Sequence, residues 1–295
     1  MQERVRVAAV AVDTKPGQFE ENLAKIDGWC KQAAEQGAEL VAFQELSLSG
    51  FLPNHPTENH EQWLRAALLQ GRRMAQTIPG PVTEKLQQTA ARYEVLISVG
   101  LLEDAGNLMF NTQILVDRSG LLGRFRKMHI PMFEMPFYNG GEAPTVVETR
   151  LGRIGVNTCF DALIPESTRL LAVQNVEIVL FPFAADPPPG DVAGWEKWAR
   201  VSLSARCIEN GVYGVASNYV GVVEAAGATQ RFPGGGMIMG PRGEQLAAWT
   251  TPSGEPGMLI HDLLRDDLLL ARSEPEYLFR FRRPELYGSL AERRT

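Results

Sequence analysis

The 295-residue sequence predicts one α/β domain, with strands and helices alternating along the chain. Short apolar runs alternate with segments whose apolar residues recur at helical spacing. Two of the runs, residues 95–102 and 176–183, are nearly continuous, which is typical of strands in a sheet covered on both faces. No Ser/Gly-rich linker or shift in composition divides the chain. We therefore expect one domain over residues 1–273, followed by a separate C-terminal segment.

The first half of the chain contains the clearest alternation. Residues 5–12 alternate as a strand does, and apolar residues then recur at helical spacing from Phe19 to Cys30. Gly37 is a suitable C-cap for that helix. The predicted elements are a strand over 5–12, a helix over 18–36, a strand over 40–43, helices over 63–76 and 82–93, a strand over 95–102, and hairpin arms over 110–116 and 123–130.

The second half repeats this theme. The predicted strands lie over 145–148, 154–158, 176–183, 214–216 and 237–239, and the predicted helices over 166–174 and 195–210. The last segment, 274–295, is rich in arginine and aromatic residues without periodicity. We expect it to pack on the domain or on a partner subunit.

Composition narrows the biochemical context. A net charge of -6 and the lack of a Lys/Arg run argue against nucleic-acid binding. No apolar run is long enough for a membrane span, and the N-terminus leads directly into a strand. The cysteines at positions 30, 159 and 207 have neither zinc nor disulfide spacing. These features predict a cytoplasmic protein with no metal, no membrane partner and no nucleic-acid partner.

Cys159 follows the predicted strand over 154–158, and a carboxylate, Asp161, follows two residues later. A strand that ends in a turn can present a thiol as a nucleophile, yet free cysteines are also among the most buried residue types. The thiol alone leaves both interpretations open. Cys30 and Cys207 lie within predicted helices and are expected to be core residues.

Two other polar residues stand at strand ends. Glu45 follows the strand over 40–43, at the carboxyl edge where open α/β sheets bind ligands. Alternation along the arm over 123–130 puts Phe125, Lys127 and His129 on one face, which indicates a polar pocket wall.

The segments around Glu45, Lys127 and Cys159, in this order along the chain, resemble the nitrilase superfamily of carbon-nitrogen hydrolases, whose members carry a catalytic Glu, Lys and Cys in such contexts. Residues 205–211 and 218–221 also resemble family motifs, so that the similarity extends from residue 5 to about residue 263. The motifs are Phe43-Gln44-Glu45-Leu46, Arg126-Lys127-Met128-His129-Ile130-Pro131 and Gly155-Val156-Asn157-Thr158-Cys159-Phe160-Asp161.

The resemblance implies a four-layer α-β-β-α sandwich, assembled as a homodimer or a larger even homo-oligomer. It implies that Glu45, Lys127 and Cys159 are catalytic and that no cofactor is required. The family also uses a second glutamate between the lysine and the cysteine. Glu134 is the best positional match for it, whereas Glu142 is interpreted as structural.

These residue types fit hydrolysis of a carbon-nitrogen bond. Glu45 can take the thiol proton as general base, while the charge of Lys127 favours the thiolate. The Lys127 ammonium and the backbone N–H of Phe160 can stabilise the oxyanion that follows attack by Cys159. A thioester on the cysteine would then be hydrolysed by water that Glu45 activates and Glu134 orients.

The residues after the cysteine bear on the substrate. Nitrilases resemble one another in having Trp-Glu there, whereas this chain has Phe160-Asp161, which favours amides or N-carbamoyl compounds over nitriles. The two arginines that bind carboxylate in D-amino-acid carbamoylases are replaced by Ala162 and Leu163, which favours an uncharged or apolar acyl group. In the loop over 184–195, Asp186, Asp191 and Trp195 could line the pocket mouth, where the acids would suit an amine-bearing substrate.

Other interpretations remain open. The chain could be a nitrilase acting on a small nitrile, or an inactive family-like scaffold that binds a partner. His129 could contact substrate, act as the base of a Cys-His hydrolase, or serve only as a structural hydrogen-bonding residue.

Overall fold

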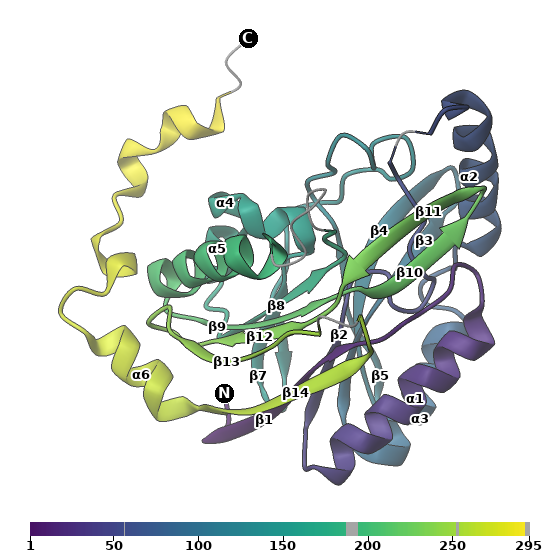
Figure 1. Cartoon of the computed structure of the whole chain (residues 1–295). Coiled ribbons are helices and arrows are strands. Elements are labelled where there is room, and N and C mark those ends of the chain that lie inside the picture. Colours follow the sequence, from purple (N-terminus) through teal and green to yellow (C-terminus); the bar gives the residue numbers. More distant parts are fainter. Residues whose placement is uncertain (56, 187–193, 252–253, 293–295) are drawn as a thin grey trace.

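Two six-stranded sheets form the centre of the computed structural model, which describes residues 1–55, 57–186, 194–251 and 254–292 (Figure 1). The first sheet has the order β14-β1-β2-β3-β4-β5 and the second β13-β12-β9-β8-β7-β6. The first comprises β1 (Arg4–Ala11), β2 (Leu40–Phe43), β3 (Leu96–Ala105), β4 (Leu108–Asp117), β5 (Gly120–Arg126) and β14 (Gly257–Leu264). The second comprises β6 (Val147–Thr149), β7 (Gly152–Val156), β8 (Ile178–Phe183), β9 (Tyr213–Asn218), β12 (Gly236–Met239) and β13 (Gln245–Trp249).

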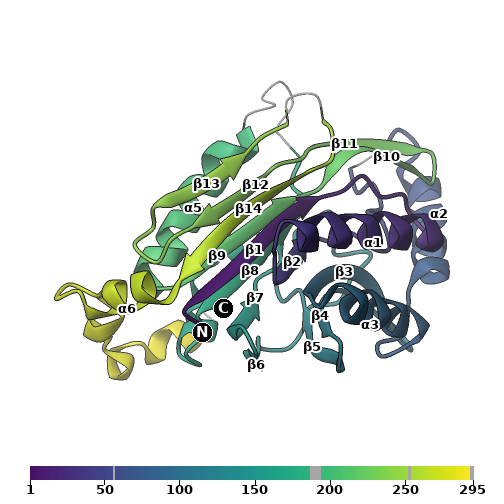
Figure 2. The ribbon, with the colours of Figure 1, turned by 90° about the horizontal axis from the view of Figure 1, so that it is seen from below.

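Helices cover the outer face of each sheet (Figure 2). Helices α1 (Phe19–Glu35) and α3 (Pro81–Tyr93) pack on the first sheet, and α4 (Pro165–Ala172) and α5 (Gly194–Asn210) pack on the second. The order of layers is therefore helix, sheet, sheet, helix, and the predicted α-β-β-α sandwich is confirmed.

Strand alternation divides the core between the layers. Along β1, Val7 and Ala9 face the second sheet, whereas Ala8 and Val10 face α1 and α3. All four side chains are buried because both faces of the strand are covered. This arrangement explains the continuous apolar runs that the sequence analysis attributed to covered strands.

The carboxyl ends of several strands meet at one edge of the sandwich. Strands β1, β2 and β3 are parallel, and β5 runs in the same direction because β3–β4 and β4–β5 are both antiparallel pairs. In the second sheet β7, β8 and β9 are parallel. The residues that follow β2, β5, β7 and β8 therefore come from four separate segments to one edge, where open α/β folds bind ligands.

A hairpin that the sequence analysis did not predict lies beyond this edge. Its strands are β10 (Val220–Ala225) and β11 (Ala228–Pro233), and it lies beside α2 (His60–Met74) (Figure 1). Trp63 and Phe232 belong to one apolar cluster with Phe51 and Tyr138. The hairpin and α2 thus enclose the edge at which the predicted site residues gather.

The chain ends with α6 (Arg265–Ser273) and three short 3₁₀ turns, Leu278–Phe281, Pro284–Leu286 and Gly288–Ala291. The start of this segment contacts the second helical layer. Tyr277 donates a hydrogen bond of 3.0 Å to the carbonyl of Asn210, and the Arg169 guanidinium lies over the Phe279 ring. The remainder extends along the side of the molecule (Figure 1).

Candidate active site

Three of the predicted catalytic side chains form one buried charge network. The Nζ atom of Lys127 lies 2.8 Å from Oε1 of Glu45 and 2.7 Å from Oε2 of Glu134. Glu45 and Lys127 are fully buried, and Glu134 is nearly so. A buried ammonium is stable only with compensating charges and hydrogen bonds, which the two carboxylates supply.

Backbone geometry at the end of β2 sets the position of Glu45. The next residue, Leu46, has φ +51°, so the chain turns sharply after the glutamate. Gly100 permits this turn, because a Cβ atom there would lie 3.1 Å from the carbonyl carbon of Glu45 and would overlap the nitrogen of Leu46. Asn111 Nδ2 donates to Oε1 of Glu45 at 2.6 Å, and the Ala184 N–H donates to Oε2 at 2.7 Å. Both carboxylate oxygens are therefore held in place.

The predicted strand over 123–130 is too long, because β5 ends at Arg126. The backbone N–H of Lys127 still donates to Asn111, but its carbonyl accepts from Gly141, and the N–H groups of Met128 and His129 turn to Asp161. The expectation that Lys127 and His129 share one strand face is therefore wrong. The Lys127 side chain is fully buried, whereas that of His129 is 41% exposed.

Asp161 links the cysteine segment to the lysine segment. Its buried carboxylate accepts hydrogen bonds from the backbone N–H of Met128 (3.2 Å) and of His129 (2.9 Å), and its Oδ1 lies 2.7 Å from Nδ1 of the His129 ring. The hydrogen bond to Asp161 raises the pKa of His129 above its ordinary value. These contacts support a structural hydrogen-bonding role for His129, while its proposed contact with substrate stays a prediction.

Cys159 stands at the start of a 3₁₀ turn, Cys159–Leu163, three residues after β7 ends. Its φ is +50°, a conformation that non-glycine residues rarely adopt and that often marks a functional site. Residue Cys159 as a whole is partly exposed, unlike the fully buried Cys30 and Cys207. Arg206 supports the turn from helix α5 by donating to the carbonyls of Ala162 and Leu163.

The charges of the network act on one another. Burial alone lowers the pKa of Lys127, but Glu134 and Glu45 raise it well above its ordinary value, so the side chain is an ammonium. Burial raises the pKa of Glu134 to about 7, against the opposing effect of Lys127. Burial and the Glu45 carboxylate raise the pKa of Cys159, whereas Lys127 and the Ala184 N–H lower it. The resting cysteine is therefore a thiol that needs a base.

Two hydrogen-bond donors remain available beside the thiol. An ammonium has three N–H bonds, and Glu45 and Glu134 occupy two of those of Lys127. The backbone N–H of Phe160 makes no hydrogen bond to any residue that the structure describes. Such donors can stabilise an oxyanion that forms next to Cys159.

The remaining predicted contacts lie around this centre. Ala162 and Trp195 are buried in the apolar cluster against which Cys159 packs, and Leu163 is half-buried. The Asp186 carboxylate is paired with Nε2 of His55 at 2.6 Å. A role for Ala162, Leu163, Asp186 and Trp195 in substrate binding stays a prediction. Asp191 lies outside the described residues.

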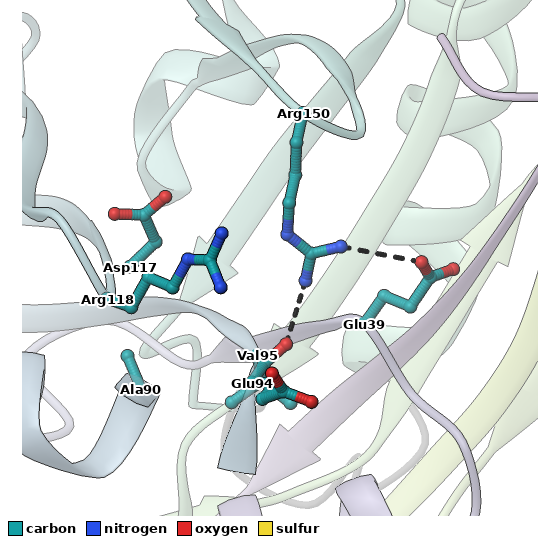
Figure 3. A pocket seen from close by; sticks show the side chains of 7 residues that line it. All are labelled: Glu39, Ala90, Glu94, Val95, Asp117, Arg118 and Arg150. Carbon is teal, nitrogen blue, oxygen red and sulfur yellow. Dashed lines mark hydrogen bonds and ion pairs between the residues drawn. The ribbon is translucent and has the colours of Figure 1, made fainter. Parts of the chain in front are cut away.

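A pocket of about 400 Å³ occurs at the other end of β2 (Figure 3). Arg150 crosses it, with Nη1 3.5 Å from Oε1 of Glu39 and Nη2 donating to the carbonyl of Glu94. Because Glu39 precedes β2 and Glu45 follows it, this pocket lies away from the charge network. Among the described residues, no His, Cys, Asp or Glu side chains form a metal-binding group, and no helix could cross a membrane.

The sequence analysis missed the residues that position the charged groups. Asn111 and Ala184 contact Glu45 across 66 and 139 residues of sequence, and a strand asparagine or a loop alanine gives no local signal. Arg206 was noted only as part of a motif. Asp161 was used to argue about substrate, although its spacing two residues after the cysteine could have indicated a structural partner.

Comparison with known proteins identifies the family. The sequence profile described as carbon-nitrogen hydrolase matches residues 6–272. The N-carbamoylputrescine amidase of Solanum lycopersicum is 30% identical over 283 residues, covering 91% of this chain and 89% of the relative. A nitrilase of Pyrococcus abyssi is 29% identical over 261 residues, covering 88% and 90%.

Solved structures share the fold over nearly the whole chain. A carbon-nitrogen hydrolase from Helicobacter pylori superposes with a TM-score of 0.80 at 20% identity, covering 99% of this chain and all of the other. An amidase from Nesterenkonia sp. superposes with a TM-score of 0.74 at 24% identity, covering 98% of each. The chain belongs to the carbon-nitrogen hydrolase family, within the nitrilase superfamily that its motifs resemble.

Proposed function

We propose that this protein hydrolyses the carbon-nitrogen bond of a small amide or N-carbamoyl compound through a thioester on Cys159. The observation that carries the proposal is the buried network of Glu45, Lys127 and Glu134 beside a partly exposed cysteine with φ +50°. Glu45 can move a proton, Lys127 can stabilise negative charge, and Cys159 can form the covalent bond.

In the first half-reaction, Glu45 takes the proton of the Cys159 thiol, and the thiolate attacks the carbonyl carbon. The third N–H of Lys127 and the N–H of Phe160 stabilise the resulting oxyanion, each contributing about 3–4 kcal/mol. Glu45 returns the proton to the leaving nitrogen as the carbon-nitrogen bond breaks. Ammonia or an amine departs and leaves a thioester.

In the second half-reaction, water attacks the thioester carbonyl. Glu45 accepts a proton from this water, and Glu134 orients it from the other side of Lys127. The same oxyanion donors stabilise the second tetrahedral intermediate, and Glu45 returns the proton to sulfur as the carbon-sulfur bond breaks. The products are the acid and the regenerated thiol. All the protons are transferred by side chains of this chain.

The surroundings of the cysteine support an uncharged or apolar acyl group. Ala162 and Leu163 stand where an arginine pair would bind a carboxylate, and the segment carrying Glu134 exposes apolar side chains of Met132, Phe133 and Met135. A variant of the Nesterenkonia sp. amidase carries acrylamide added at its active-site cysteine. These features favour a small neutral amide.

Ammonia release tests the proposal. Wild type and Cys159→Ala are incubated with primary amides, N-carbamoyl compounds and nitriles of matched chain length. We expect wild-type turnover of amides or carbamoyl compounds and none by the variant. Turnover of nitriles alone would assign the chain to nitrile hydrolysis, as the name of the Pyrococcus abyssi relative would favour. No turnover of any compound would support an inactive scaffold.

We further propose a homodimer or larger even homo-oligomer in the reducing cytoplasm. Exposed apolar side chains on α6 and the C-terminal segment support assembly, and three free cysteines suit a reducing compartment. Sedimentation equilibrium of the full chain tests the assembly, and a monomer at micromolar concentration would contradict it. The exposed residues include Leu269, Leu270, Phe281, Leu286 and Leu290.

A further inference from the structure

Tyr138 lies one turn of backbone beyond Glu134. The N–H of Tyr138 donates to the Glu134 carbonyl at 3.1 Å, an i to i+4 bond that closes a single α-turn. Side chains four residues apart in such a turn lie on the same side, with Cβ atoms about 5–6 Å apart. Since the Glu134 side chain reaches Lys127, the turn directs Tyr138 toward the same charge network.

Contacts on both sides of Tyr138 hold it there. Asn139 donates to the Met109 carbonyl and Gly141 donates to the Lys127 carbonyl, each at 2.8 Å. The Tyr138 side chain is 6% exposed and belongs to one apolar cluster with Leu46 and Ala184. Leu46 follows Glu45, and the Ala184 N–H donates to Glu45, so the ring packs among the immediate neighbours of that carboxylate.

No side-chain hydrogen bond joins the Tyr138 hydroxyl to any residue that the structure describes. Burial, together with the Glu134 and Glu45 carboxylates, raises the pKa of this hydroxyl well above its ordinary value. It therefore stays a neutral O–H group. Tyr213 is a useful contrast. It is also buried, yet its hydroxyl donates to the carbonyl of Leu264 and accepts from the N–H of the same residue.

The hydroxyl feels the charge of both carboxylates but is hydrogen-bonded to neither, and a phenol oxygen has lone pairs that can accept a hydrogen bond. In the proposed reaction the leaving nitrogen of the amide must approach Glu45 to receive its proton. An N–H group on that nitrogen is therefore the donor that we expect for the Tyr138 hydroxyl. We propose that Tyr138 accepts a hydrogen bond from the carboxamide NH₂ of the substrate and thereby turns the leaving nitrogen toward Glu45. This inference rests on the proposed function and adds a preference for primary amide or carbamoyl nitrogen.

A comparison of an amide with an ester tests this role. Tyr138→Phe removes one oxygen and keeps the ring. The substrates are the primary amide that wild type hydrolyses best and the methyl ester of the same acid. Both form the same thioester, but only the amide has N–H groups. Because kcat/KM reports the steps through acylation, we expect Tyr138→Phe to lower the amide value about three- to tenfold and to leave the ester value unchanged.

Tyr213→Phe is the matched control. It loses two hydrogen bonds far from the site, so we expect a lower Tm with an unchanged ratio of amide to ester kcat/KM. An equal loss on both substrates by Tyr138→Phe, or no loss on the amide, would overturn the role of the hydroxyl but leave the proposed function standing. Failure of wild type to hydrolyse any amide or carbamoyl compound would overturn both.

Discussion

The Nζ atom of Lys127 lies 2.8 Å from Oε1 of Glu45, at a point where neither side chain is exposed to solvent. Removing two charges from water is costly, and their attraction offsets that cost only when further hydrogen bonds satisfy the remaining atoms. Here Glu134, Asn111 and the Ala184 N–H supply those bonds. Under the proposed mechanism these residues contribute to both stability and catalysis, so changes to the network should alter both.

Lys127→Met should disrupt this network and lower both stability and kcat. It leaves two carboxylates buried without a counter-charge, and we expect the free energy of unfolding to fall by about 3–5 kcal/mol. It also removes an oxyanion donor, so kcat should fall at least about 10²-fold. Urea denaturation and steady-state kinetics check the two effects.

His129→Ala is the companion change that separates this mechanism from a Cys-His hydrolase. The ring is one of three donors to Asp161, and the two backbone N–H groups remain. We expect a loss of about 1 kcal/mol in stability and retained turnover. If His129→Ala abolished turnover while Lys127→Met retained it, Lys127 could not have the role assigned to it.

Glu134 should make the free energy of unfolding decrease as the pH rises. Burial raises its folded pKa from an ordinary 4.5 to about 7, so between these values the folded state holds a proton that the unfolded state has lost. Unfolding then releases a proton, and rising pH favours it. We expect the free energy of unfolding of wild type, relative to Glu134→Gln, to decrease from about pH 4.5 to about pH 7 and then level off. A difference that grew with pH in urea denaturation would contradict this.

Thiol alkylation should distinguish the three cysteines. Cys159 is partly exposed and has Glu45 nearby to accept its proton, whereas Cys30 and Cys207 are fully buried in the core. We expect iodoacetamide to modify Cys159 first, as measured by peptide mass spectrometry. Equal rates should appear only in concentrated urea. Equal rates in the folded protein would show that the thiol is not activated.

Two glycine substitutions should have opposite effects. A Cβ atom at Gly141 would lie 2.7 Å from the carbonyl oxygen of Arg126, beside the backbone bond to Lys127. Gly141→Ala should therefore lower kcat and cost about 1–3 kcal/mol of stability. Gly28 in helix α1 faces open space, so Gly28→Ala should raise stability by about 0.5–1 kcal/mol with unchanged kcat. Thermal melts and kinetics on both variants give the comparison, and equal kcat values would contradict the proposed support of Lys127.

Local patterns in the sequence predicted most of the layered core. Continuous apolar runs predict the covered strands β3 and β8, and apolar residues at helical spacing predict the helices that cover the sheets. The end of β5 could not be predicted in this way. It depends on Asp161, which lies 32 residues after His129 in the sequence. The Asp161 carboxylate accepts the backbone N–H groups of Met128 and His129, which would otherwise be free to extend the strand.

Partners far apart in sequence explain what was missed at the site. Motifs indicated Glu45, Lys127 and Cys159, but the carboxylate of Glu45 is oriented by the backbone of Ala184, which any residue except proline could supply. The pairing of Asp186 with His55 joins two loops separated by 131 residues. Neither relationship leaves a periodic or compositional signal.

Detection of an acyl group on Cys159 tests the central claim most directly. Wild type is mixed with its best amide, quenched in acid within the first turnovers, digested and examined by mass spectrometry. The account predicts that the peptide containing Cys159 gains the mass of the acyl group, that hydroxylamine removes it, and that Cys159→Ala yields neither adduct nor ammonia. Sustained turnover with no adduct on Cys159, or turnover by Cys159→Ala, would contradict it.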